Sequence, residues 1–144
     1  RSGRVTGVQT CALPISYDTL KREVPYGENS RIDFLLTTAE RPVYIEVKNS
    51  TWAQDRLCLF PDTVTTRGQK HLRELTALVP EARAVMLYFI NRGDCDRFAP
   101  GDSADPKYGQ LLRDAIAAGV EVLPCRFDIS PEGIRYLGLA QLDL

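Results

Sequence analysis

The chain has 144 residues, the size of one domain, and 44% of them are hydrophobic, which is enough to bury a core. Its formal net charge of −1 gives no bulk attraction to a polyanionic partner. The apolar runs have the length of strands, so the sequence contains no candidate membrane span.

Residues 1–16 differ from the rest of the chain. The stretch RSGRVTGVQTCALPIS has two arginines, no acidic residue and no clear period. Its part VTGVQTCALPI resembles the translation of a common sequencing-adapter oligonucleotide. It also lacks the charged n-region and long h-region of a signal peptide. We therefore predict that residues 1–16 are a non-native leader and that the domain spans residues 17–144.

The next residues predict two strands joined by a tight turn. Residues 21–28 (KREVPYGE) predict a short first strand that ends in the turn. In residues 31–36 (RIDFLL), apolar and polar side chains alternate with a period of two. We expect Ile32, Phe34 and Leu36 to point inward.

A third strand is predicted at residues 42–49 (PVYIEVKN). The preceding polar residues, TTAERP, have the length of a hairpin connection, so this strand is expected to run antiparallel to residues 31–36. Alternation divides its side chains between two faces: Val43, Ile45 and Val47 on the first, and Tyr44, Glu46 and Lys48 on the second. The first face is expected to be buried.

The first helix is predicted at residues 67–79. A loop at residues 59–66 precedes it and ends in two threonines that can cap the helix. Its inward stripe is expected to consist of Leu72, Leu75 and Val79. Pro80 ends the helix.

The second half of the chain predicts two further strands and one helix. Residues 82–90 (ARAVMLYFI) are almost continuously apolar, which is typical of a strand buried on both faces. We expect a long polar loop at 91–106, a helix at 107–118 capped by Gly119, and a strand at 120–129. The tail after residue 129 has no clear pattern. The order β, β, β, α, β, α, β predicts an α/β fold with a mixed sheet and flanking helices.

The cysteines favour a reducing compartment. Beyond Cys11 in the leader, the chain has Cys58, Cys95 and Cys125, widely spaced and odd in number. The sequence has no CxxC pair, which argues against a zinc site. Scattered free thiols are typical of the cytoplasm.

The hairpin carries the residues best suited to chemistry. Asp33 and Glu46 lie on its two strands, and Mg²⁺ is typically held by one or two carboxylates. Lys48 lies about 6–7 Å from Glu46 along the same face, where an ammonium can orient or deprotonate a water that attacks a phosphodiester. A second interpretation stays open, because Glu-x-Lys is frequent on the solvated face of a strand and then forms only a weak salt bridge.

The first turns of the helix at 67–79 are a candidate anion site, since helix N-termini favour negative charge. The candidate contacts to DNA phosphates or to the attacking water are Arg67, Gln69, Lys70 and His71. Each also has an ordinary interpretation: Lys70 can form an i,i+4 pair with Glu74, and His71 can be a surface residue.

Several segments together resemble one family. The runs EVPYGENSRIDFLL, RPVYIEVKN and FPDTVTTRGQKHLREL, with YGQLLRDAIAAGVEVL and RFDISPEGI further on, closely resemble the sugar fermentation stimulation protein A family. The resemblance covers residues 17–144. It implies a restriction-endonuclease-like PD-(D/E)xK core that binds DNA, preceded in the family by an OB-like domain that is expected to be missing here.

The resemblance also implies roles for individual residues. Asp33 matches the first acidic motif, and Glu46 with Lys48 matches the E-x-K element. The implied metal ligands are Asp33, Glu46 and the Val47 carbonyl, with Mg²⁺ as the cofactor and Mn²⁺ as a substitute. The acidic residue of the first core helix has no counterpart after Tyr17, and Glu23 is a weaker stand-in.

Three hypotheses follow for the function. The first is a Mg²⁺-dependent nuclease that uses Asp33, Glu46 and Lys48. The second is a non-catalytic DNA-binding regulator of sugar (maltose) metabolism on a nuclease scaffold. The third is a structural or partner-binding domain whose acidic face is solvated. Without the OB-like domain, we expect weak and salt-sensitive DNA binding.

Overall fold

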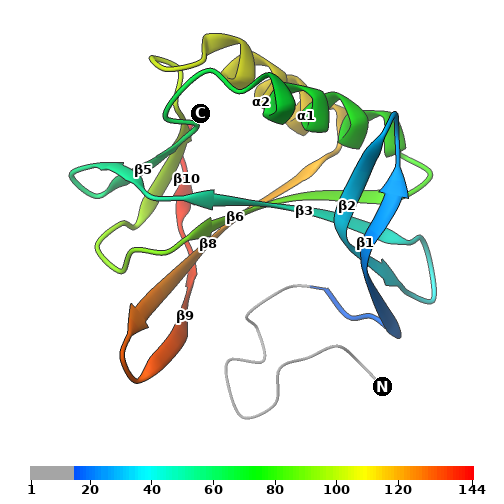
Figure 1. The fold of residues 1–144 in the computed structure, drawn as a ribbon, viewed down its shortest axis with the longest axis horizontal. Coiled ribbons are helices and arrows are strands. Elements are labelled where there is room, and N and C mark those ends of the chain that lie inside the picture. The colour runs from blue at the N-terminus through cyan, green and yellow to red at the C-terminus, as the bar shows by residue number, and fades with distance from the viewer. Residues whose placement is uncertain (1–14) are drawn as a thin grey trace.

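A six-stranded sheet with two helices on one face dominates the computed structural model, which describes residues 15–144 (Figure 1). Its strand order is β1-β2-β3-β6-β8-β9. The central strands β3, β6 and β8 are parallel, and the outer strands pair antiparallel. The elements are β1 (Thr19–Tyr26), β2 (Ser30–Thr37), β3 (Val43–Ser50), α1 (Thr66–Leu78), β6 (Arg83–Ile90), α2 (Pro106–Ala118), β8 (Glu121–Ser130) and β9 (Gly133–Leu139).

The predicted α/β fold with a mixed sheet and flanking helices is confirmed. The helices α1 and α2 connect parallel strands, as crossover connections do. Thr65 caps α1 by accepting the backbone N–H of Gly68, and Gly119 ends α2 in the left-handed conformation. Within residues 15–144, no helix combines the length and apolar character that crossing a membrane requires.

A second, smaller sheet was not predicted. Its order is β10-β7-β5-β4, and its strands are β4 (Trp52–Gln54), β5 (Leu57–Phe60), β7 (Arg97–Pro100) and β10 (Gln141–Leu142). The predicted loops at 59–66 and 91–106 are therefore partly wrong, and the tail forms β9 and β10. The strands of the smaller sheet have two to four residues, too short to carry a local period, and β7 pairs with segments far away in the sequence.

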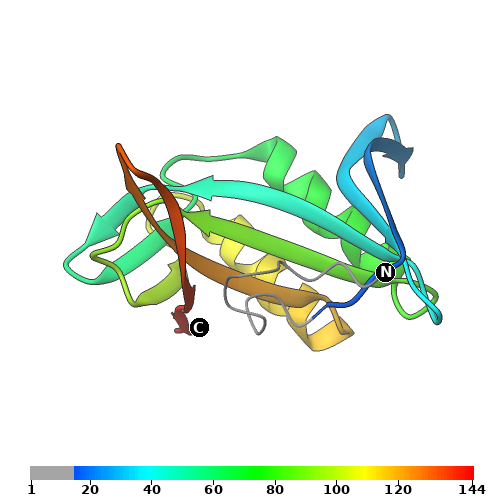
Figure 2. The same ribbon diagram turned by 90° about the horizontal axis from the view of Figure 1, so that it is seen from below.

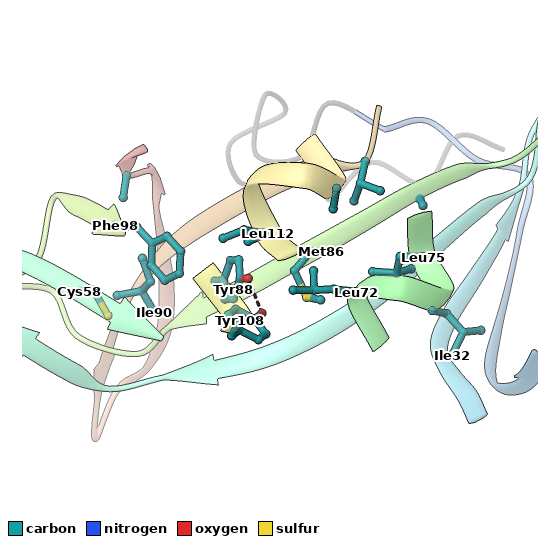
Figure 3. Packing of buried hydrophobic residues seen from close by; sticks show 14 of the residues in the cluster. Ile32, Cys58, Leu72, Leu75, Met86, Tyr88, Ile90, Phe98, Tyr108 and Leu112 are labelled. Atoms are coloured by element: carbon teal, nitrogen blue, oxygen red, sulfur yellow. Dashed lines mark hydrogen bonds between the residues drawn. The ribbon is translucent and has the colours of Figure 1, made fainter. Parts of the chain in front are cut away.

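The main core lies between the sheet and the helices (Figure 3). Leu72 and Leu75 of α1 are fully buried there, as predicted, whereas Val79 is half-buried at the C-cap. Tyr88 of β6 and Tyr108 of α2 are fully buried in this core, and their hydroxyls share a 2.5 Å hydrogen bond.

The opposite face of the sheet has its own apolar cluster. Val43 and Ile45 of β3 pack there with Val85 of β6. Met86, the next residue of β6, belongs to the helix-side core, so β6 is buried on both faces as predicted.

The hairpin of β1 and β2 bends away from the sheet toward α1 (Figures 1 and 2). The predicted inward set of β2 is divided by this bend: Ile32 joins the helix-side core, whereas Phe34 and Leu36 lie on the opposite face. The β1–β2 register is interrupted at Asp33, opposite Glu23, whose φ is +55°. A local break of this kind rotates the strand, so the simple alternation predicted for residues 31–36 fails.

Candidate active site

Asp33 lies where β2 and β3 stop pairing. The ladder of the two strands ends at the Phe34–Ile45 pair, and continuing its register places Asp33 opposite Glu46. Instead of a main-chain bond, the Asp33 carboxylate accepts the backbone N–H of Val47 at 2.7 Å. In an extended strand the N–H and C=O of one residue point the same way, so the Val47 carbonyl faces this gap as well.

Glu46 is buried beneath α1. It is only 4% exposed, on the face of β3 that the helices cover. Its Oε2 atom lies 3.3 Å from Lys48 Nζ and 3.1 Å from His71 Nδ1. The interpretation of a solvated Glu-x-Lys face is therefore wrong for this strand, because α1 covers it.

The second oxygen of Glu46 has no protein partner. Within residues 15–144, the buried side-chain oxygens or nitrogens without a hydrogen bond are Glu46 Oε1 and the Tyr26 hydroxyl. A buried carboxylate oxygen without a partner is costly in a folded protein. It is the kind of atom that a cation or an ordered water satisfies.

His71 was expected at the surface but is buried. It follows Gly68 by three residues and precedes Leu75 by four, which places all three on the inner face of α1. Its Nδ1 atom lies 2.9 Å from Lys48 Nζ. The spacing to Leu75 is a signal in the sequence, but a single polar residue in an apolar stripe does not by itself indicate burial.

The other three predicted phosphate contacts have different positions. Arg67 is exposed, and Lys70 Nζ donates to the carbonyl of Glu28 at 2.5 Å. Gln69 is buried, and its amide donates to both carboxylate oxygens of Asp105, the N-cap of α2. Gln69 thus links the two helices.

A hollow of about 400 Å³ opens beside these residues. Asp33 and His71 line it, whereas Glu46 and Lys48 are not part of its lining. The remaining lining residues are Glu23, Asn29, Ser30, Arg31, Arg67 and Lys70. Three cationic residues and the acidic residues Asp33 and Glu23 in its lining give it the character of a site for a phosphate with a cation.

The turn between β1 and β2 forms one wall of the hollow, and α1 holds it in place. The Glu74 carboxylate accepts the backbone N–H of Glu28 at 2.8 Å and the Ser30 hydroxyl at 2.6 Å. Burial acts to raise the pKa of Glu74, but these two hydrogen bonds and nearby Lys70 outweigh it, and the pKa is lowered. Sequence reasoning missed this role, because it placed Glu74 in a pair with Lys70.

The electrostatics of the site favour a cation. Burial raises the pKa of Asp33, and the neighbouring carboxylates of Glu46 and Glu23 raise it further, against the lowering effects of the Val47 N–H and Lys48. Burial and then the Glu46 carboxylate likewise raise the pKa of the Tyr26 hydroxyl. Ionised Asp33 is therefore disfavoured in the folded protein, and a bound cation would offset that cost.

The donor set fits a hard divalent cation. Among residues 15–144, no three His, Cys, Asp or Glu residues form a closed metal-binding cluster. Asp33 and Glu46 with the Val47 carbonyl instead provide a partial, all-oxygen set of the kind that Mg²⁺ completes with waters and phosphate. The unpartnered Glu46 Oε1 atom is the observation that supports this fit.

Comparison with known proteins gives consistent matches. Residues 5–133 match the family model described as "Sugar fermentation stimulation protein RE domain". The chain is 72% identical over 138 residues to the sugar fermentation stimulation protein homolog of Synechococcus elongatus, covering 94% of this chain and 58% of the relative. The homolog of a Nostoc species is 70% identical over 131 residues, covering 88% and 54%. The chain therefore spans about half the length of the curated relatives it matches.

A solved structure shares the nuclease-like fold. It is titled "The structure of Pyrococcus Furiosus SfsA in complex with Ca2+" and matches with a TM-score of 0.81 at 29% identity. The match covers 86% of this chain and 54% of that one. The family match begins inside residues 1–16, of which residues 1–14 lie outside the described part of the chain, so the interpretation of that segment as a leader stays a prediction.

Proposed function

This chain belongs to the sugar fermentation stimulation protein (SfsA) family, and we propose that its nuclease-like core binds DNA and hydrolyses phosphodiester bonds with Mg²⁺. The observation that carries the proposal is Glu46: one oxygen is bonded to Lys48 and His71, and the other is buried and unpartnered beside the gap that holds Asp33. A bound cation would satisfy this oxygen, and this supports the proposal.

The residues that would hold the ion are Asp33, Glu46 and the Val47 carbonyl. Bound Mg²⁺ supplies charge neutralisation at the phosphate and lowers the pKa of a coordinated water. A relative of known structure is described in complex with Ca²⁺, a cation that takes the same oxygen ligands, and this supports the assignment. Mn²⁺ is expected to substitute.

Lys48 is the residue proposed to orient the attacking water. Its Nζ atom is held between Glu46 Oε2 and His71 Nδ1, so its position is fixed before the substrate arrives. An ammonium has three donors, which leaves one for a water or a phosphate oxygen.

DNA is proposed to bind at the hollow beside Asp33, and not through the net charge of the whole chain. The chain as a whole is nearly neutral, but Arg31, Arg67 and Lys70 surround the hollow that contains Asp33. These side chains can bind backbone phosphates on either side of the bond to be cleaved. Binding of this kind carries little sequence specificity and weakens steeply with salt.

The test is a plasmid-nicking assay in Mg²⁺, Mn²⁺ or EDTA, with this chain and with the full-length Synechococcus elongatus relative in parallel. We expect metal-dependent nicking that Lys48→Ala reduces at least about 100-fold, the scale of losing a catalytic group. Lys107→Ala removes an exposed lysine outside the hollow and is the matched control. Nicking that survives Lys48→Ala would contradict the role of Lys48.

One observation favours the alternative of a DNA-binding regulator that does not cut. The Lys48 ammonium is already engaged by two side chains, which suits a structural role. If DNA binds with strong salt dependence but neither chain nicks it in any metal, the regulatory proposal replaces the catalytic one.

A further inference from the structure

Two buried polar side-chain atoms of residues 15–144 have no hydrogen bond: Glu46 Oε1 and the Tyr26 hydroxyl. Glu46 is 4% exposed and Tyr26 is 9% exposed. The proposed cation accounts for the first atom only. We propose that Tyr26 is a positioning residue of the candidate metal site, whose hydroxyl accepts a hydrogen bond from a water in the hydration shell of the cation. This inference rests on the proposed function, because it assigns a further residue to the same site.

The ring of Tyr26 lies on the face of β3 that carries Glu46. Its centroid is 6.0 Å from that of Tyr44, and both tyrosines pack in the helix-side core. Tyr44 and Glu46 are two residues apart in β3, so their side chains point to the same face. Tyr26 therefore reaches this face from β1, whereas the expected metal ligands come from β2 and β3.

The hairpin fixes the position of Tyr26. This residue is the last of β1 and pairs with Ser30, the first residue of β2. The Ser30 hydroxyl donates to Glu74 of α1 at 2.6 Å, so the helix holds this end of the hairpin. The phenol ring is therefore in place before a cation binds, as suits a residue that orients the ligands of a metal.

The surroundings of the Tyr26 hydroxyl are acidic. Burial raises its pKa most, and the carboxylates of Glu46, Glu74 and Asp33 raise it further, in that order. The hydroxyl is neutral at physiological pH, as an ordinary phenol is, yet none of these carboxylates accepts its hydrogen. Carboxylates attract a cation, and the waters that hydrate a divalent cation are good hydrogen-bond donors because the ion withdraws charge from them. The Tyr26 oxygen is an acceptor that suits such a water.

A phenylalanine at position 26 would pack in the same place without an unpartnered hydroxyl. The contact with Tyr44 depends on the ring alone, and a buried hydroxyl without a hydrogen bond destabilises the fold. A water that bonds the hydroxyl offsets this cost when the cation is bound.

Calorimetric titration with Mg²⁺ or Mn²⁺, in the absence of DNA, tests the inference. Tyr26→Phe removes the hydroxyl and retains the ring, and Tyr44→Phe makes the same change in the neighbouring, half-buried ring. We expect Tyr26→Phe to bind either ion about tenfold more weakly than the wild type, the lower end of the effect of an outer-shell partner. Tyr44→Phe should bind both ions as the wild type does. Unchanged affinity in Tyr26→Phe would overturn the inference.

Thermal melting separates metal binding from folding. In EDTA, Tyr26→Phe should melt at or above the Tm of the wild type, because an unpartnered buried hydroxyl is gone. Millimolar Mg²⁺ should raise its Tm less than it raises that of the wild type, since a weaker ligand stabilises less. A purely structural hydroxyl predicts the opposite, a lower Tm in EDTA with an unchanged shift by Mg²⁺, and that result would also overturn the inference.

A crystal of the wild-type chain with Mn²⁺ shows the contact itself. The anomalous signal of manganese locates the ion, and one of its waters should lie within about 3 Å of the Tyr26 oxygen. An ion bound by Asp33 and Glu46 without a water at Tyr26 would refute the inference.

The two proposals can fail separately. Ion binding that Tyr26→Phe weakens, without nicking of DNA in any metal, would refute hydrolysis and leave the present inference intact. Metal-dependent nicking by the wild type, with unchanged ion affinity in Tyr26→Phe, would refute the present inference alone. If neither ion binds the wild-type chain, both are refuted.

Discussion

The Asp33 carboxylate binds the backbone N–H of Val47 across two strands that have stopped pairing with each other. This hydrogen bond takes the place of a main-chain hydrogen bond between β2 and β3. The two strands therefore stay adjacent at this point without pairing. A gap between adjacent strands exposes backbone groups that a continuous sheet would use up. The site therefore exists because β2 bends toward α1 at Asp33, next to the last residue that pairs with β3.

The charge of Asp33 is expected to destabilise the protein when no metal is bound. Its pKa is raised by burial and by nearby carboxylates, so the folded state holds a proton more tightly than the unfolded state. Stability then falls as the pH rises from the ordinary carboxyl pKa through the raised one, and the cost persists at neutral pH. Asp33→Asn keeps an oxygen for the Val47 N–H and should raise the Tm at pH 7 by about 2 °C.

Calorimetry in two conditions checks this prediction. At about pH 3, where the wild-type carboxyl is protonated, the two proteins should melt alike. Millimolar Mg²⁺ should raise the Tm of the wild type and leave that of Asp33→Asn unchanged. A lower Tm for Asp33→Asn at pH 7 without metal would show that the carboxylate stabilises the fold.

Lys48 is expected to stabilise the fold by neutralising Glu46. Lys48→Met removes the ammonium and leaves a buried carboxylate with His71 as its remaining partner. The loss should be about 2–3 kcal/mol in urea unfolding, since breaking one partner of a buried pair is costly. Adding Glu46→Gln to Lys48→Met should recover most of the loss, because both charges are then gone.

An exposed ion pair is the matched control. Arg56 and Asp96 form a 2.8 Å pair with both side chains largely in solvent, and Arg56→Met should have no measurable effect on unfolding. Equal losses for Lys48→Met and Arg56→Met would contradict the burial argument.

Gln69 and Arg67 are expected to separate stability from DNA binding. Gln69→Leu removes the two hydrogen bonds that the Gln69 amide donates to Asp105, a buried N-cap, and should cost about 1–3 kcal/mol with DNA affinity unchanged. Arg67→Ala should leave the Tm unchanged and reduce the slope of log affinity against log salt by about 0.9, the value of one phosphate contact. Arg73→Ala, exposed on the same helix but outside the hollow, is the control. The assignment of Gln69 to structure fails if its substitution weakens DNA binding at an unchanged Tm.

The fold and the placement of the two acidic residues on neighbouring strands could be predicted because both depend on local patterns. The alternation in residues 42–49 and the short polar connection before them place Asp33 and Glu46 on the two strands of one hairpin, although the pairing of β2 and β3 ends at Phe34–Ile45, one residue before Asp33 is reached. The stripe containing Leu72 and Leu75 similarly specified the buried face of α1.

The burial of the site could not be predicted in the same way. A period of two indicates that Glu46 and Val47 lie on opposite faces, but not which face a helix covers. In this mixed sheet both faces are packed, and the face of β3 that carries Glu46 and Lys48 lies under α1. The position of α1 depends on tertiary contacts such as the Gln69–Asp105 bonds and on the bend of β2, neither of which has a local signal.

Gly27 is expected to control the shape of the hollow. It has φ +57°, and a Cβ built there would lie 2.5 Å from Glu74 Oε2, the atom that holds the Glu28 N–H. Gly27→Ala should therefore displace Glu74, release the turn that carries Ser30 and lower DNA affinity as well as Tm. The free energy of unfolding should fall by about 1–3 kcal/mol, from backbone strain and the lost hydrogen bonds.

Gly133→Ala separates the effect of backbone strain from the effect of displacing Glu74. Gly133 has φ +138°, at least as demanding for an alanine, but a Cβ there meets nothing within 4 Å. It should lower the Tm and leave DNA affinity unchanged, whereas Gly27→Ala lowers both. Glu74→Gln weakens the same contacts without any backbone change, so it should reproduce the DNA defect of Gly27→Ala with a smaller loss of stability. Wild-type affinity in Glu74→Gln would show that the turn forms the wall of the hollow without help from α1.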